Sequence, residues 1–196
     1  MIALIIVDIQ NDFLPGGSLY VPRGEEIIPL VNALVPNYSM VVATQDWHPA
    51  KHESFASQHP GMEPFQQITL HGLPQTLWPE HCVQHSYGAE FAADLTPEAL
   101  VQVFQKGLDT RVDSYSGFFD NGHIHATGLG DYLMDKGVSE VHICGLAADY
   151  CVYFTALDAL KLGFKTVILQ AATRPIEEAS YATKKAYFKA QGGRLL

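Results

Sequence analysis

Short apolar segments rich in β-branched residues alternate along the chain with segments of helical periodicity, and this alternation constrains the fold most. The predicted strands are Ile2–Val7, Met40–Thr44, Val101–Gln105, Val141–Cys144 and Thr166–Leu169. Their near-continuous hydrophobicity is typical of a sheet covered on both faces. The expected helices are Glu25–Leu34, Leu129–Lys136, Asp149–Leu162 and Pro175–Ala190. This order predicts an α/β fold with a mostly parallel central sheet.

The chain is expected to form a single domain, residues 1–196, because 196 residues suffice for one ordinary domain and not for two. The stretch from about residue 47 to 96 departs from the alternation, since it is rich in His, Pro and Gly and has little periodicity. Loops of this length in a compact domain usually carry function or are disordered. The aromatic residues of this stretch argue against disorder.

Composition excludes several classes of partner. The formal net charge is -9 and no basic stripe is present, which argues against a nucleic-acid partner. No apolar stretch reaches the length of a membrane span, so no membrane partner is expected. The three cysteines are Cys82, Cys144 and Cys151. An odd, low count indicates free thiols in a reducing compartment, and a cytoplasmic protein is expected.

Reactive side chains follow four of the predicted strands. Asp8 follows the first strand, Asp46 and His48 the second, Lys106 the third, and the fourth leads through a turn to Cys151. In open α/β sheets, ligands bind beyond the carboxyl ends of the strands. These side chains should therefore meet at one edge, which is the main argument from the residues for an enzyme.

Asp8, Lys106 and Cys151 combine a base, a cation and a nucleophile. Taken singly, each has a plainer interpretation: Asp8 as a turn cap, Lys106 as a surface lysine, Cys151 as a buried structural cysteine. Cys151 lies near a helix start, where the helix N-terminus and a cation would lower the pKa of its thiol. Together the three match the pattern of an activated thiol.

A second group contains residues of metal-ligand type. Asp46 and His48 are two residues apart, so an extended backbone places them on one side. His52 can join them if the chain turns at Pro49, and His81 would have to arrive from the long loop. Oxygen and imidazole ligands suit zinc, iron or manganese. Cys82, beside His81, is a further but weaker ligand candidate.

The motifs resemble those of a known enzyme family across nearly the whole chain. The matching stretches are Val7–Phe13, Gly16–Leu19, Thr44–Pro49, His52–Ala56, Trp78–Cys82, Lys106–Gly107, Asp113–Phe118 and Gly145–Val152. The chain is similar here to the nicotinamidases of the isochorismatase-like cysteine hydrolases. The resemblance implies a Rossmann-like, three-layer α/β/α fold.

The resemblance also implies roles for individual residues. Asp8, Lys106 and Cys151 would form the catalytic triad, and the N–H groups of Ala147 and Cys151 would form the oxyanion hole. One divalent metal ion, zinc first with iron or manganese as alternatives, would bind Asp46, His48 and His81. In some relatives the position of His52 binds as well. Substrate-binding positions fall on Phe13, Trp78, Tyr115 and Leu146, with a cis peptide bond at Leu146–Ala147.

The implied reaction is the hydrolysis of nicotinamide to nicotinate and ammonia in NAD salvage, through a Cys151 thioester, with pyrazinamide as a further substrate. A homo-oligomer is left open. Two alternatives remain: another hydrolase of the same family, or a catalytically silent α/β domain that binds a ligand. The first alternative conflicts with the metal-ligand stretch, and the second with the presence of both Asp8 and Cys151.

Overall fold

The structure, a computed structural model, describes residues 1–96 and 100–196; residues 97–99 of the expected single domain lie outside the described residues. Its central sheet has six parallel strands in the order β5-β2-β1-β6-β7-β8. The strands are β1 Ile2–Val7, β2 Val41–Asp46, β5 Gln102–Lys106, β6 Glu140–Leu146, β7 Lys165–Arg174 and β8 Arg194–Leu195. The predicted parallel sheet is therefore confirmed, while β8 was not predicted.

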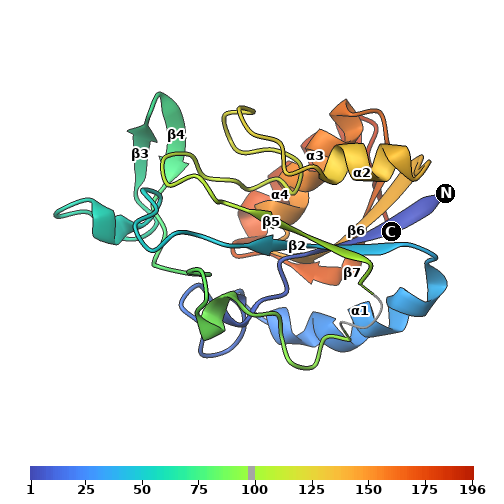
Figure 1. Cartoon of the computed structure of the whole chain (residues 1–196), viewed down its shortest axis with the longest axis horizontal. Coiled ribbons are helices and arrows are strands. Elements are labelled where there is room, and N and C mark those ends of the chain that lie inside the picture. The colour runs from blue at the N-terminus through green and yellow to red at the C-terminus, as the bar shows by residue number, and fades with distance from the viewer. Residues whose placement is uncertain (97–99) are drawn as a thin grey trace.

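Helices cover both faces of this sheet, which gives the expected three layers (Figure 1). They are α1 Ile28–Leu34, α2 Leu129–Asp135, α3 Cys151–Lys161 and α4 Glu178–Ala190. The short 3-10 helices are Asn11–Phe13, Gly24–Ile27, Val35–Asn37, Ala56–Gln58 and Tyr87–Ala89. In Figure 1, α1 lies below the sheet, whereas α2, α3 and α4 lie above it.

The alternation of side chains along β1 separates two hydrophobic cores. Leu4 and Ile6 belong to the core that includes residues of α1. Ile5 and Val7 belong to the core that includes residues of α2, α3 and α4. All four side chains are fully buried, as expected for the middle of a doubly covered sheet. Such burial on both faces leaves only the strand ends for polar chemistry.

The long stretch 47–96 contains a hairpin that the sequence analysis did not predict. Its strands are β3 Gln67–Leu70 and β4 Leu73–Thr76, which pair antiparallel. The two residues between them, His71 and Gly72, have φ of +48° and +85°. Positive φ at both central residues is the geometry of a tight hairpin turn that follows strand twist. The expectation of a long loop without regular structure is wrong at this point.

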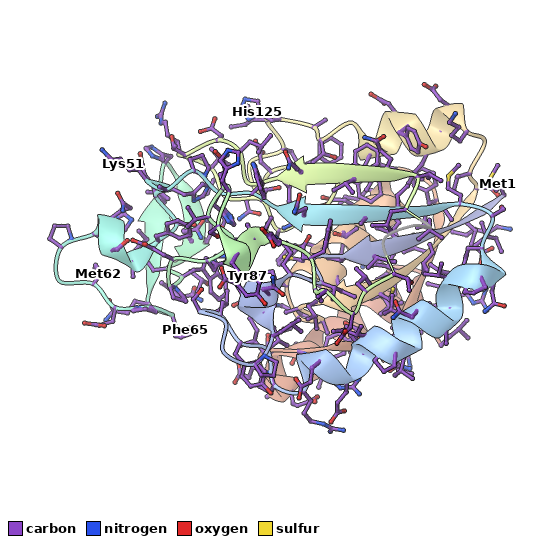
Figure 2. The ribbon with its side chains drawn as sticks, turned by 60° about the horizontal axis from the view of Figure 1, so that its bottom comes forward. Met1, Lys51, Met62, Phe65, Tyr87 and His125 are labelled. Carbon is purple, nitrogen blue, oxygen red and sulfur yellow. The ribbon has the colours of Figure 1, made fainter. Side chains whose placement is uncertain are left out.

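The hairpin end of the molecule lies opposite the chain start. Figure 2 shows Met1 at one end, and Met62 and Phe65 at the other. Since β1 runs away from Met1, the carboxyl ends of the parallel strands point toward the long stretch. Within the described residues, no helix has both the length and the apolar character needed to cross a membrane.

Candidate active site

The carboxyl ends of four neighbouring strands supply the polar side chains of the site. Asp8 follows β1, Asp46 ends β2, Lys106 ends β5, and the turn after β6 leads to Cys151 at the start of α3. Each of these side chains is buried. The convergence predicted from the strand order is thus present in the structure.

Lys106 is the centre of this cluster. Its amine lies 3.0 Å from Asp8 Oδ2 and 3.4 Å from Cys151 Sγ, and it also contacts the Asp46 carboxylate. A further bond of 2.8 Å goes to the Ser114 carbonyl. Burial disfavours the ammonium, but the carboxylates of Asp46 and Asp8 outweigh it and hold the pKa of Lys106 well above its ordinary value. Lys106 is therefore a permanent cation between a carboxylate and a thiol.

Asp8 is held in one orientation beside the thiol. Thr44 Oγ1 donates a 2.5 Å hydrogen bond to Asp8 Oδ1, while Oδ2 faces Lys106. One oxygen each of Asp8 and Asp46 and the sulfur of Cys151 lie within 4.8 Å of one another. Asp8 Oδ2 is paired with the Lys106 ammonium at 3.0 Å. A buried carboxylate that lies beside both a cation and a thiol is placed to accept the proton of that thiol.

The protonation of Cys151 differs from the expectation. Burial raises the pKa of the Cys151 thiol well above its ordinary value; Lys106 lowers it, and the charges of Asp8 and Asp46 raise it further. The expected net lowering of this pKa is therefore wrong, because burial and two neighbouring carboxylates outweigh the effect of Lys106. The resting nucleophile is a neutral thiol that needs a base.

The turn between β6 and α3 exposes two backbone donors beside the sulfur. The Leu146–Ala147 peptide bond is cis, as the resemblance implies. Neighbouring N–H groups are paired: Ala148 donates to the Arg174 carbonyl and Val152 to the Ala147 carbonyl. The N–H groups of Ala147 and Cys151 have no protein acceptor among residues 1–96 and 100–196. Two unpaired donors near a nucleophile can stabilise an oxyanion.

Asp46, His48 and His81 form a buried group whose ligand atoms lie within 4.8 Å of one another. His81 Nδ1 bonds to the Pro79 carbonyl at 2.8 Å, which leaves Nε2 available. Burial lowers the pKa of His81 to about 3, so its ring is neutral and retains a lone pair. Neither nitrogen of His48 has a hydrogen-bond partner within the described residues, and its Nε2 lies 3.6 Å from Asp113 Oδ1. Buried imidazole nitrogens without hydrogen bonds, next to a carboxylate, fit a divalent metal ion.

His52 belongs to a different group. Its ligand atom lies with those of His48 and Asp113, and not with the set that contains Asp46 and His81. His52 Nδ1 pairs with Ser54 Oγ at 2.7 Å. The structure therefore groups His52 with His48 and Asp113, and its participation in the expected ion site stays a prediction. Asp113 is a residue that the sequence analysis missed as a site residue, although it lies in a motif that the resemblance used.

Gln10 is a second missed residue. Its amide nitrogen donates to the carbonyl of Asp46 at 2.8 Å, and its amide oxygen accepts from the Asp46 N–H at 2.9 Å. The same nitrogen also bonds to the Ala89 carbonyl at 2.8 Å. A buried glutamine at this position ties the end of β2 to the long stretch. Its sequence signals were its place two residues after Asp8 and within the stretch Val7–Phe13 that carries the resemblance.

A cavity lies between Cys151 of the triad and Asp46 and His81 of the metal-type group. It is lined by Phe13, Leu19, Asp46, Trp78, His81, Asp113, Tyr115, Ala147, Tyr150, Cys151 and Ile176. The predicted Phe13, Trp78 and Tyr115 are thus at the cavity. Leu146 is not: its side chain is fully buried in the core on the α1 side, because it is the last residue of β6 and points into that core. A role of Leu146 in binding the substrate stays a prediction.

Cys82, the weaker ligand candidate, also lies outside the metal-type group. It is buried, its N–H bonds to Asp12 Oδ2 at 2.7 Å, and its sulfur faces the Gly88 carbonyl. Burial raises the pKa of its thiol well above the ordinary value. Cys82 is thus a packed neutral thiol.

Comparison with known proteins places this geometry in a family. The model of the isochorismatase domain matches residues 2–196. The nicotinamidase of Escherichia coli K12 is 49% identical over 178 residues, covering 89% of this chain and 83% of that protein. The structure of an Acinetobacter baumanii nicotinamidase and pyrazinamidase aligns with a TM-score of 0.97 at 42% identity, covering 100% of this chain and 95% of the other.

A structure with a metal is also similar. The pyrazinamidase of Pyrococcus horikoshii, solved in complex with zinc, aligns with a TM-score of 0.81 at 38% identity, covering 100% of this chain and 98% of that chain. The match of the family model to almost every residue, together with these identities, exceeds what a shared fold alone produces. The chain belongs to the isochorismatase domain family of hydrolases.

Proposed function

We infer that this protein is a nicotinamidase, which hydrolyses nicotinamide to nicotinate and ammonia in NAD salvage, and that it also accepts pyrazinamide. One observation carries this conclusion: Cys151 of the buried Asp8–Lys106–Cys151 cluster lines the same cavity as Asp46 and His81 of the buried Asp46–His48–His81 group. The identity to nicotinamidases supports the choice of substrate.

In the first half of the reaction, Asp8 removes the proton of the Cys151 thiol as the sulfur attacks the amide carbon. Lys106, between the two groups, compensates the charge that moves from carboxylate to thiolate. The oxygen of the tetrahedral intermediate is stabilised by the N–H groups of Ala147 and Cys151. Asp8 then gives its proton to the amide nitrogen, the C–N bond breaks, and ammonia leaves a thioester behind.

In the second half, a water molecule replaces ammonia. Asp8 takes a proton from this water as it attacks the thioester carbon, and the same two N–H groups bind the new oxyanion. The C–S bond breaks, the thiolate of Cys151 takes back the proton that Asp8 holds, and the product acid loses its remaining proton to solvent and leaves as nicotinate. The neutral resting thiol fits this scheme, because the base is within reach and no preformed thiolate is needed.

Aromatic residues would hold the ring of the substrate. Phe13, Trp78 and Tyr115 line the cavity, and Trp78 Nε1 donates to the Tyr115 hydroxyl at 3.3 Å. That bond fixes two of the walls against each other. A pyridine ring between them gains apolar contact, and aromatic pairs contribute about 0.5–1.5 kcal/mol beyond their buried area.

Asp46, His48 and His81 would hold the divalent ion, and we propose zinc, with iron or manganese as alternatives. One carboxylate and two imidazoles suit these ions, and such a set leaves positions open to a ligand. When bound, the ion would supply a Lewis acid for the pyridine nitrogen and would thereby orient the ring. The zinc complex of the similar pyrazinamidase supports this choice.

The test is to incubate the purified protein with nicotinamide and to measure ammonia and nicotinate. We expect both products in equal amounts, loss of activity after treatment with a chelator, and recovery on adding zinc. Isochorismate and a carbamoyl amine substrate serve as comparison substrates for other members of the family. If one of them is hydrolysed and nicotinamide is not, the proposed function is wrong.

A further inference from the structure

Lys184 on α4 occupies an unusual position for a lysine. It is half-buried, and its amine lies 4.3 Å from the centre of the Tyr150 ring and 5.6 Å from those of Tyr153 and Phe154. It also donates a 2.5 Å hydrogen bond to the Asp149 carbonyl. Within residues 1–96 and 100–196, it forms no ion pair with a carboxylate. The charge of Lys184 is thus compensated by the faces of aromatic rings and by one carbonyl, which belongs to the turn that carries the nucleophile.

Tyr150, the ring beneath this cation, is part of the cavity wall. It lines the cavity next to Cys151 and meets two further wall residues edge to face. Its ring centre lies 4.8 Å from that of Trp78, at an interplanar angle of 84°, and 5.3 Å from that of Tyr115, at 71°. The cation therefore contacts a ring whose other neighbours are the predicted substrate-binding aromatics.

We propose that Lys184 is a positioning residue that holds the Tyr150 ring in the wall of the substrate cavity and thereby sets the affinity for the carboxamide. This inference rests on the nicotinamidase function proposed above. Lys184 does not itself line the cavity. It acts through Tyr150, which reaches the cavity from the residue before the nucleophile.

The physical reason is that two kinds of contact restrain the ring in different directions. The ammonium is attracted to the ring face, which limits tilting of the ring plane. The edge-to-face contacts with Trp78 and Tyr115 limit rotation within the wall. Without the cation, the ring and the adjoining wall sample more orientations, so binding the substrate must order them.

The fixed orientation of the Tyr150 ring is needed equally for the bound substrate and for the transition state. An interaction common to both changes KM and leaves kcat nearly unchanged. For Lys184→Met, which keeps the length and apolar stem of the side chain, we expect KM for nicotinamide to rise roughly threefold to tenfold, the range of a partly desolvated cation–π contact. The value of kcat should stay within about twofold.

The chain offers a matched control on the same helix. Lys185 lies 4.7 Å from the centre of the Tyr181 ring, and neither residue lines the cavity. Lys185→Met removes the same kind of contact one residue away and should leave KM unchanged. Lys184→Arg retains a cation that stacks on aromatic rings and should restore KM to near the wild-type value. If Lys184→Met does not fold, as judged by thermal melting, Lys184→Gln takes its place.

A double-mutant cycle tests whether Lys184 acts through Tyr150. In the Tyr150→Leu background, Lys184→Met should raise KM no further, because the ring that it positions is absent. A rise of the same size in both backgrounds would overturn the inference, and so would an unchanged KM or a fall in kcat alone. If the wild-type protein releases no ammonia from nicotinamide, the proposed function fails as well; an active wild type with an unaffected Lys184→Met variant overturns the inference alone.

Discussion

Asp149→Asn should destabilise the protein strongly, although the two side chains have nearly the same shape. Asp149 is fully buried, and its two carboxylate oxygens accept hydrogen bonds from the N–H groups of Ile176 at 2.8 Å and Glu177 at 3.0 Å. These bonds connect the nucleophile turn to the start of α4. Asparagine has one acceptor oxygen, so one buried backbone N–H must face an NH₂ group.

The magnitude follows from these contacts. A hydrogen bond to a charged group contributes about 1.5–3 kcal/mol, and a buried unpaired donor costs about 1–3 kcal/mol. Burial raises the pKa of Asp149, which means that enclosing its charge has a cost that the neutral amide avoids. After this offset we expect a loss of about 2 kcal/mol in the free energy of unfolding. For a chain of this size that corresponds to a fall in Tm of about 4–8 °C.

The assay is thermal and urea unfolding of the wild type and two variants. Glu177→Gln is the control, because the Glu177 side chain is exposed and only its backbone N–H reaches Asp149; its stability should change by no more than about 0.5 kcal/mol. Asp149→Ala removes both acceptors and should lose more stability than Asp149→Asn. If Asp149→Asn melts within about 1 °C of Glu177→Gln, the two bonds do not stabilise the fold and the reasoning is refuted.

Three further predictions concern the chemistry. Cys151→Ala should release no measurable ammonia while it keeps the wild-type Tm and metal content. The control is Cys144→Ala, which should stay active because Cys144 is buried on β6 away from the cavity. Turnover by Cys151→Ala would mean that another group or water attacks the amide. The rate at which iodoacetamide alkylates Cys151, followed by mass spectrometry, should be low at pH 7 and rise about tenfold per pH unit. The reason is that the pKa of this thiol is raised, so the thiolate forms only as pH increases. A rate that is independent of pH above 7 would indicate a preformed thiolate. Benzamide lacks the ring nitrogen that a bound ion would accept. In the metal-loaded enzyme, kcat/KM for benzamide should therefore be at least about a hundredfold lower than for nicotinamide, since a site built around a polar partner discriminates against an analogue without it. Equal values for the two substrates would contradict a role of the ion in orienting the ring.

Local sequence determined the layers of the fold and the meeting of the catalytic groups. Continuous β-branched segments can be buried on both faces only in a parallel sheet covered by helices, and parallel strands point their carboxyl ends in one direction. Asp8, Lys106 and the turn to Cys151 follow such segments directly in the sequence. Their convergence was therefore predictable without any knowledge of distances.

Element boundaries depended on contacts between distant residues. Helical periodicity predicts helices from Asp149 and from Pro175, but α3 begins at Cys151 and α4 at Glu178. The Asp149 carboxylate accepts hydrogen bonds from the N–H groups of Ile176 and Glu177. These bonds hold the residues before α3 and those before α4 against each other, and neither segment is helical. Strand β7 likewise extends to Arg174, beyond the predicted Leu169, because Thr173 and Arg174 pair with the end of β6 after a register shift.

Only the tertiary structure decided which polar residues share a site. Spacing alone allows His52 to join Asp46 and His48, but the path of the chain after Pro49 places His52 with His48 and Asp113, and not in the group of Asp46. The pKa of the Cys151 thiol depends on enclosure and on two carboxylates from other strands, which no local motif encodes. Lys184 carries no motif, and its contact with Tyr150 exists because α4 packs on α3, which follows Tyr150 directly. Residue type and order determine which chemistry is available, whereas burial and long-range packing determine how each group behaves.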